Sequence, residues 1–312
     1  MRIAFTGKGG SGKSTLTALF VGYLRSSGHR VLAVDADVNV HLADLLGVDA
    51  ARERALSQPR NAAQIRRHLL GSNPLIDGIE HFVPTTPPGP GSRLVTLDPG
   101  DPVLVSHACR LDEHLHVMHV GTYEPDDIGT GCYHGHLAIL ENLLSHTRLA
   151  PGDWLVCDMV AGTDAFANSL HAQFDLIVVA VEPTPESVSV ARRYRELAAA
   201  AGVDDAVVLV GNKVTDDDDR HYLDRELRGE LVAAVPMQPG LRRARQAGRR
   251  PLLSDLEDVA ALREVAERAQ QSLLPAERRA GLLRDLHLRL AEQSWVRHRH
   301  GDVSTQLEAA PR

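Results

Sequence analysis

The feature that most constrains this chain is a glycine-rich turn between its first apolar strand and the helix that follows. Residues 7–14 read Gly-Lys-Gly-Gly-Ser-Gly-Lys-Ser and fit the G-x-x-x-x-G-K-[ST] spacing. Such a loop brings backbone N–H groups close to phosphate oxygens, and the positive end of the following helix adds to the attraction. Lys13 would neutralise the β- and γ-phosphates, and the Ser14 hydroxyl would bind Mg²⁺. The sequence therefore predicts a nucleoside triphosphate site. Its predicted contacts here are Gly9, Gly10, Ser11, Gly12, Lys13, Ser14 and Thr15.

Short β-branched runs alternate with helical stretches along most of the chain. The pattern predicts an α/β fold, with a mostly parallel sheet covered by helices on both faces. The predicted strands are residues 3–6, 31–35, 117–121, 154–158, 176–181 and 207–212. The predicted helices are residues 14–26, 136–146, 185–200 and 258–274.

Two segments depart from this pattern. Residues 50–102 are rich in proline and glycine, and we expect an irregular insertion rather than core. Residues 276–293 form a further helical run with leucines at helical spacing among arginines, after which the polar end is expected to fray. We expect this helix to pack on its own domain or on a second subunit, rather than on a membrane surface. The predicted organisation is a nucleotide-binding domain over 1–274 and a C-terminal helix and tail over 275–312.

Composition excludes several classes of protein. The 312 residues are 43% hydrophobic, without an apolar run near the roughly 18 residues of a membrane span. A net charge of -7 and only 4% aromatic residues argue against a dedicated nucleic-acid binder. Three cysteines cannot build a disulfide framework, and the first residues read as a strand rather than a signal peptide. We therefore expect a cytoplasmic protein with reduced thiols.

Lys8 makes the loop more specific. With this extra lysine, the loop resembles that of the MinD/ParA class, which includes partitioning ATPases, septum-site ATPases and the nitrogenase iron protein. The resemblance implies ATP hydrolysis by a homodimer in which Lys8 reaches the phosphates bound by the partner subunit. It also implies that Asp37 orients the attacking water and binds Mg²⁺, and that Asp158 holds Mg²⁺ through water. Gly162 would offer its amide to the γ-phosphate.

The same resemblance extends to the adenine. Asn212 and Lys213 follow a predicted strand and match the base-contacting positions of the class. Pro236 and Met237 would then line the base pocket. These elements occur in order over about residues 1–274, which is most of the chain.

Residues 157–162, Cys-Asp-Met-Val-Ala-Gly, and the pair Glu182-Pro183 narrow the resemblance further. They look like the CooC-type ATPases that assist nickel insertion into carbon monoxide dehydrogenase, which implies a client metalloenzyme. That family carries a Cys-x-Cys pair where this chain has Cys132-Tyr133-His134. Two Cys-x-His pairs in a dimer would form a Cys₂His₂ tetrahedron that suits Zn²⁺ and is acceptable to Ni²⁺.

Other interpretations stay open at this point. Residues 129–132, Gly-Thr-Gly-Cys, resemble the cluster-binding segment of the nitrogenase iron protein, but Val160 and Ala161 stand where a second cysteine is needed. An iron–sulfur cluster therefore ranks below a metal ion, and Cys132 and His134 are alternatively an unrelated pair. A positioning ATPase that acts on DNA or membrane is the alternative function. Its best basic cluster is Arg242, Arg243, Arg245, Arg249 and Arg250, which we weigh against a solvated helix face.

Overall fold

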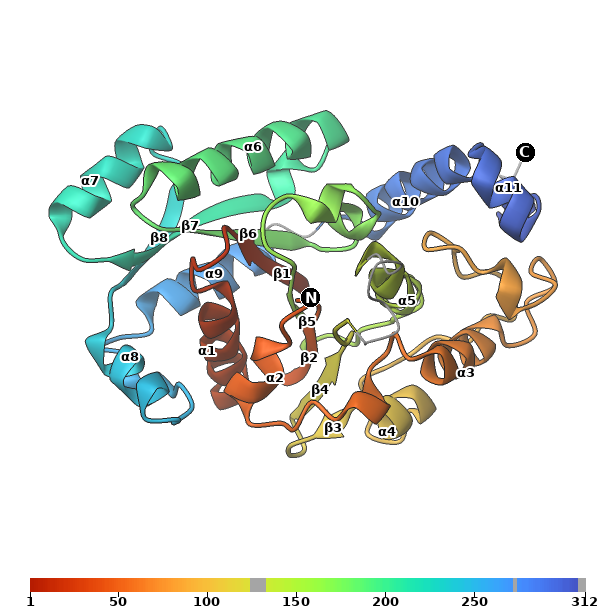
Figure 1. Cartoon of the computed structure of the whole chain (residues 1–312), viewed down its shortest axis with the longest axis horizontal. Helices are drawn as coiled ribbons and strands as arrows, with labels where there is room; N and C mark the ends of the chain where they lie inside the picture. The colour runs from red at the N-terminus through yellow and green to blue at the C-terminus, as the bar shows by residue number, and fades with distance from the viewer. Residues whose placement is uncertain (124–132, 272–273, 308–312) are drawn as a thin grey trace.

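The computed structural model describes residues 1–123, 133–271 and 274–307. Its centre is an eight-stranded sheet in the order β3-β4-β2-β5-β1-β6-β7-β8 (Figure 1). Every neighbouring pair is parallel except β3 and β4. The strands are β1 Arg2–Gly7, β2 Arg30–Asp35, β3 Cys109–Arg110, β4 Leu115–His119, β5 Asp153–Asp158, β6 Leu176–Val181, β7 Val207–Val214 and β8 Leu231–Pro236.

Side chains alternate between two apolar cores on opposite faces of the sheet. Ile3 and Phe5 of β1 enter the core formed with α1, α2 and α9, whereas Ala4 enters the core formed with α3, α5, α6 and α7. The predicted parallel sheet with helices on both faces is therefore confirmed. The helices are α1 Lys13–Ser26, α2 His41–Leu46, α3 Pro59–Leu70, α4 Pro102–His107, α5 Tyr133–Ser145, α6 Pro185–Ala201, α7 Asp217–Glu226, α8 Pro239–Gln246, α9 Ala260–Gln271, α10 Ala276–Ala291 and α11 Ser294–His300.

Strand boundaries differ from prediction mainly on the outer part of the sheet. β4 covers residues 115–119 rather than 117–121, and β7 continues two residues beyond 212. β3 and β8 were not predicted. β3 has only two residues, and the adjacent alanines Ala233 and Ala234 weaken the strand pattern of β8.

Residues 50–102 belong to the core, and the expectation that they stand apart from it is wrong. Leu56, Ile65 and Phe82 are buried in the same cluster as the sheet and α5. Val95 also forms an isolated parallel β-bridge with Thr147, which lies between α5 and β5. Prolines and glycines interrupt the secondary structure here, but the apolar side chains between them still face inward, which the irregular pattern conceals.

The chain after Trp295 is folded rather than frayed. Residues 294–300 form α11, and the following 3₁₀ helix Val303–Gln306 buries Val303. The buried ring of His287 bonds the Thr85 hydroxyl at 2.9 Å and the Val303 carbonyl oxygen at 2.9 Å. The polar composition suggested solvent exposure, but side chains of this end bond polar groups of the 79–86 segment, and sequence alone does not reveal these partners. Among the described residues, no helix has the length and apolar character needed to cross a membrane.

A buried carboxyl group ties α5 to the segment that follows β5. Glu141 accepts hydrogen bonds from the backbone N–H of Ser169 at 2.8 Å and from its hydroxyl. Burial raises the pKa of Glu141 from 4.5 to about 7, although the bonds from Ser169 oppose this shift. In the pH window between these values, the folded protein keeps a proton that the unfolded chain has lost. Stability therefore falls as the pH rises from about 4.5 to 7.

We expect Glu141→Gln to raise the melting temperature at about pH 8 by roughly 5 °C and to change it little at about pH 5. The amide can still accept from Ser169, and it removes the cost of ionisation. Thermal melts at both pH values, with Glu196→Gln on the exposed face of α6 as the control, measure this effect. Equal shifts at the two pH values would contradict the assignment.

Candidate functional site

The predicted site residues meet where the parallel strands end. β1 lies between β5 and β6, and the strands that follow β1 in the chain are added first on one side of it and then on the other. Ligands of open α/β sheets bind at such a crossing, outside the carboxyl ends of the strands. A cavity of about 450 Å³ lies there, and a second cavity of about 330 Å³ shares part of its lining. The shared residues are Gly12, Thr15, Lys213 and Arg245.

The loop between β1 and α1 has a backbone that only glycine suits. Gly10 and Gly12 have left-handed φ angles of 88° and 83°. A Cβ on Gly12 would lie 2.6 Å from the side-chain nitrogen of Asn212, and one on Gly7 would lie 2.5 Å from the Ala180 carbonyl oxygen. By contrast, nothing lies within 4 Å of a Cβ placed on Gly9 or Gly10. The loop is therefore packed tightly against its supports and open toward the cavity.

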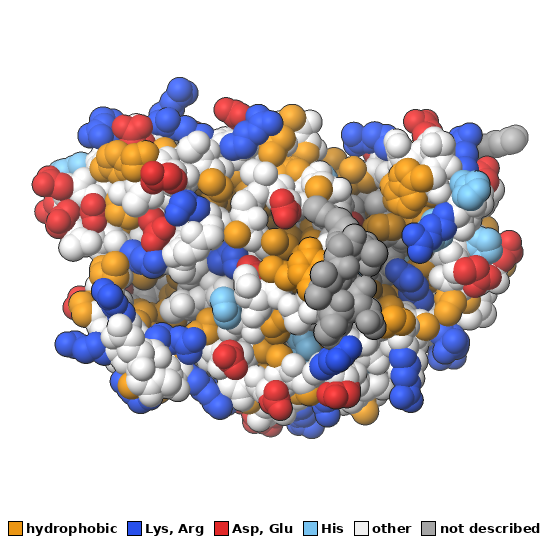
Figure 2. Space-filling view, viewed as in Figure 1, with side chains coloured by type: hydrophobic (Ala, Val, Ile, Leu, Met, Phe, Trp, Pro, Cys, Tyr) orange, Lys and Arg blue, Asp and Glu red, His pale blue; other side chains and the backbone are white. Residues whose placement is uncertain are grey.

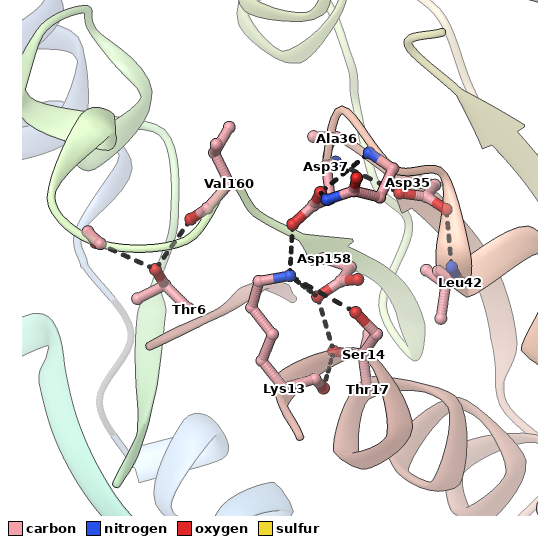
Figure 3. Close-up of polar contacts among 12 residues, drawn as sticks. Thr6, Lys13, Ser14, Thr17, Asp35, Ala36, Asp37, Leu42, Asp158 and Val160 are labelled. Carbon is pink, nitrogen blue, oxygen red and sulfur yellow. Dashed lines mark hydrogen bonds and ion pairs between the residues drawn. The ribbon is translucent and has the colours of Figure 1, made fainter. Parts of the chain in front are cut away.

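Lys13 is buried at the centre of the site (Figure 3). Its ammonium lies 2.5 Å from Asp37 Oδ2, 3.8 Å from Asp158 Oδ1 and 3.4 Å from the Ser14 hydroxyl. Burial alone would lower the pKa of Lys13, but Asp158 and the hydrogen bond to Asp37 raise it. Lys13 therefore carries a full positive charge at neutral pH and can bind phosphate oxygens.

The three aspartates at the strand ends have different roles. Asp35 accepts from the backbone N–H groups of Leu42 at 2.7 Å and Ala43 at 3.2 Å, so it fixes the start of α2. Asp37 lies two residues beyond the end of β2, so the alternation of side chains along the strand does not decide where it points. Its carboxylate pairs with Lys13. The hydrogen bond from Lys13 holds the pKa of Asp37 below its ordinary value, although burial opposes this shift. Asp37 is therefore ionised at neutral pH.

Asp158 is the carboxylate with spare bonding capacity. It is fully buried, and its Oδ2 atom has no hydrogen-bond partner. Burial raises its pKa to about 6, and Lys13 opposes this shift. A carboxylate oxygen left without a partner suits a cation or its bound water, and Mg²⁺ typically takes one or two carboxylates with phosphate and water oxygens. Ser14, Asp37 and Asp158 fit that description.

A transition-metal site would need a cluster of ligating side chains. Among the described residues, no group of three or more His, Cys, Asp or Glu side chains could hold a metal ion. Cys132 and the side chain of His134, the predicted interfacial ligands, lie outside the part of the chain that the structure describes.

The predicted base-side residues also come together. Asn212, at the end of β7, donates to the Ser11 carbonyl oxygen at 2.7 Å, and Pro236 and Met237 line the second cavity. Lys213 has a left-handed φ of 59°, and its ammonium bonds Gly10 O at 2.6 Å and Glu182 Oε1 at 2.7 Å. β7 thus supports the phosphate loop as well as the base side.

One predicted residue, Gly162, lies differently from expectation. The Gly162 amide donates to the Gly7 carbonyl oxygen at 2.9 Å instead of facing the phosphate cavity. Its segment is also held by Thr6, whose hydroxyl donates to Val160 O and Gly162 O, so the chain after β5 folds against the end of β1. The Lys8 ammonium lies 3.5 Å from Gly9 O on the exposed side of the loop, and Lys8 is not part of the cavity lining.

Sequence reasoning missed two residues of the site. Asn39 donates to Asp37 Oδ1 through its backbone at 3.0 Å and its side chain at 2.8 Å, so it orients that carboxylate. An asparagine two residues after an aspartate was the available signal. Arg245 lines both cavities from α8, over which basic side chains gather (Figure 2). Arg245 belongs to the arginine cluster of the sequence, and the fold brings it to both cavities and Arg242 to the base-side cavity.

A chain that ends its central strand in this loop and surrounds the loop lysine with strand-end carboxylates is a P-loop ATPase. The chain belongs to the CobQ/CobB/MinD/ParA nucleotide binding domain family, whose sequence model matches residues 3–283. The resemblance to MinD and ParA proteins is thereby confirmed, as is the prediction of an ATPase.

Individual relatives agree with this assignment. The chain is 28% identical to the carbon monoxide dehydrogenase accessory protein CooC of Rhodospirillum rubrum over 80% of this chain and 88% of that protein. It is 26% identical to an uncharacterized ATP-binding protein of Methanocaldococcus jannaschii over 76% of this chain and 85% of the relative.

Solved structures share the fold. The cell division ATPase MinD of Pyrococcus furiosus matches with a TM-score of 0.55 and 18% identity, over 86% of this chain and 98% of that chain. A ParA family ATPase from Chlorobium tepidum matches with a TM-score of 0.54 and 15% identity, over 87% of this chain and 95% of that chain.

Arg245 gives a direct test of the site. We expect Arg245→Ala to weaken ATP binding by about tenfold, because a guanidinium at the junction of the two cavities can contact phosphate oxygens. Titration with a fluorescent ATP analogue measures the dissociation constant. Arg243→Ala, on the same helix but outside both linings, is the matched control. Equal losses in the two variants would mean that only the general charge of α8 matters.

Proposed function

We propose that this ATPase assists the maturation of a metalloenzyme, with nickel as the favoured cargo and zinc as the alternative. In this proposal the chain works as a homodimer whose ATP-driven closure is coupled to a site built from Cys132 and His134 of both subunits. The observation that carries the proposal is the similarity to the CooC accessory protein, which extends over 88% of that protein. The Asp-Met-Val-Ala-Gly segment at 158–162, which resembles the corresponding segment of CooC-type ATPases, supports the same proposal.

The nucleotide chemistry follows from the residues of one subunit. Mg·ATP would enter with its phosphates on the glycine loop, where Lys13 exchanges its contacts with Asp37 and Asp158 for phosphate oxygens. Ser14 and the free oxygen of Asp158 would then hold Mg²⁺, directly or through water. Asp37, released from Lys13 and oriented by Asn39, would position the water that attacks the γ-phosphate. ADP and inorganic phosphate are the products.

Lys8 would complete the partner's site on dimer closure. Its position outside the cavity of its own subunit fits a lysine that acts on the other subunit. We expect Lys8→Ala to keep its affinity for ATP and to lose about a hundredfold or more in kcat, because a cation supplied in trans acts mainly in the transition state.

Mixing variants tests the crossing directly. Lys8→Ala and Asp37→Asn are each expected to be inactive, whereas a mixed dimer has one site with intact Asp37 and the partner's intact Lys8. Recovery of ATPase activity on mixing supports the arrangement. A Lys8→Ala protein with unchanged kcat contradicts it.

Metal loading tests the maturation role. After chelator treatment and loading with Ni²⁺ or Zn²⁺, we expect one ion for every two chains by elemental analysis, because a tetrahedral Cys₂His₂ site needs both subunits. Cys132→Ala is expected to lose the ion, and Cys109→Ala, which changes a half-buried thiol elsewhere, is expected to keep it. If no stoichiometric metal binds to the wild type, the coupled metal site is wrong.

The alternative is a positioning ATPase of the MinD or ParA kind, acting on DNA or on a membrane surface. The observation in its favour is the exposed basic surface over α8, which includes Arg242 and Arg243. Arg242 and Arg245 also line the base-side cavity, so nucleotide binding accounts for part of this charge. Co-sedimentation with DNA or anionic vesicles, with and without ATP, separates the two functions. ATP-dependent pelleting that disappears at high salt would favour positioning.

A further inference from the structure

Tyr133 lies between Cys132 and His134 in the sequence and begins α5. Its side chain is buried, and its ring packs against the rings of Tyr123 and His136 with centroids 5.9 Å and 5.6 Å apart. The start of α5 is therefore held by a buried aromatic residue.

The hydroxyl of Tyr133 points to the backbone of the catalytic segment. It lies 3.1 Å from the carbonyl oxygen of Ala36 and 3.3 Å from that of Gly121, so its single proton is shared between the two acceptors. Burial, followed by the negative charges of Asp35 and Asp37, raises the pKa of Tyr133, which keeps the hydroxyl protonated as a donor.

Ala36 is the residue between Asp35 and Asp37, and both of its peptide groups are held. Its N–H donates to the Asp158 carbonyl oxygen at 2.9 Å, and its carbonyl oxygen receives the Tyr133 hydroxyl. A displacement of Asp37 that moves the Ala36 carbonyl must therefore stretch the bond to α5 or carry the first turn of the helix with it.

The same helix is also anchored to the chain that follows β5. Two turns further on, Glu141 accepts from Ser169, in the chain that follows Asp158. One helix thus contacts the Asp37 segment through Tyr133 and, through Glu141, the chain eleven residues beyond Asp158. A helix transmits such a displacement along its length, because its backbone hydrogen bonds resist bending.

We propose that the Tyr133 hydroxyl is a positioning group that couples the Asp37 segment of the ATP site to the first turn of α5, which Cys132 directly precedes in the sequence. The coupling deepens the proposed function and rests on it only for ATP binding and hydrolysis, not for the presence of a metal. Tyr133 contacts neither substrate nor metal in this role. It acts through the peptide of Ala36.

Thiol labelling of metal-free protein measures the coupling. Iodoacetamide modification is followed at each cysteine by peptide mass spectrometry, with and without Mg²⁺ and a non-hydrolysable ATP analogue. In the wild type, we expect nucleotide to change the labelling rate of Cys132 by about threefold or more while that of Cys109 stays constant, because only Cys132 adjoins the coupled turn. In Tyr133→Phe, which removes one oxygen and keeps the ring, we expect the nucleotide effect on Cys132 to disappear.

Steady-state kinetics give a second readout. Tyr133→Phe is expected to lower kcat by about tenfold and to leave the KM for ATP within about twofold, since Asp37 acts on the attacking water and the loop binds the nucleotide. Tyr194→Phe removes the same atom from a buried tyrosine of α6 and is expected to change neither the kinetics nor the labelling. Melting curves of both variants establish that they are folded.

The outcomes separate the inference from the proposed function. Binding of the analogue without any change in Cys132 labelling in the wild type overturns the coupling, whether or not the variant folds. Full retention of the nucleotide effect in Tyr133→Phe also overturns it. Failure to bind the analogue at all overturns both the ATPase assignment and the coupling. Because transition metals are absent, failure of the metal-maturation role leaves the result unaffected.

Discussion

The buried ammonium of Lys13 is the interaction on which the site depends. Buried carboxylates on neighbouring strands repel one another, and burial of a charge without a partner is costly. Asp37 and Asp158 are held in one small volume because Lys13 lies between them, while Asp35 is held apart by the backbone N–H groups of α2. The same ammonium is positioned by the glycine loop and by the first turn of α1. One residue therefore connects the helix, the loop and two strand ends.

Much of this site could be predicted because its signals are local. The spacing of residues 7–14 fixes a turn between a strand and a helix, and strand ends carry Asp158 and Asn212 to one edge of the sheet. The direction of the Gly162 amide could not be predicted, since it depends on how the chain after β5 meets Gly7. The same limit applies to Arg245, which reaches the cavity only through the placement of α8 after β8.

The fold likewise has parts that local sequence patterns predict and parts that they do not. Short β-branched apolar runs identified the inner strands, whereas residues 50–102 and the segment after Trp295 were misjudged. In both segments, burial is achieved by side chains at irregular spacing, such as Leu56 and Phe82, and by polar pairs such as His287 with Thr85. The contact between His287 and Thr85 joins residues that are 202 positions apart, and a local pattern carries no information about it.

The support of the glycine loop by β7 has a consequence for how the protein is made. Asn212 bonds the carbonyl oxygen of Ser11 across 201 positions of sequence, and Lys213 reaches Gly10 across 203. During synthesis the loop leaves the ribosome long before these residues do. The nascent chain therefore carries a phosphate loop without its final scaffold while the 201 residues that lead to Asn212 are made, and the complete nucleotide site forms only when β7 joins the sheet.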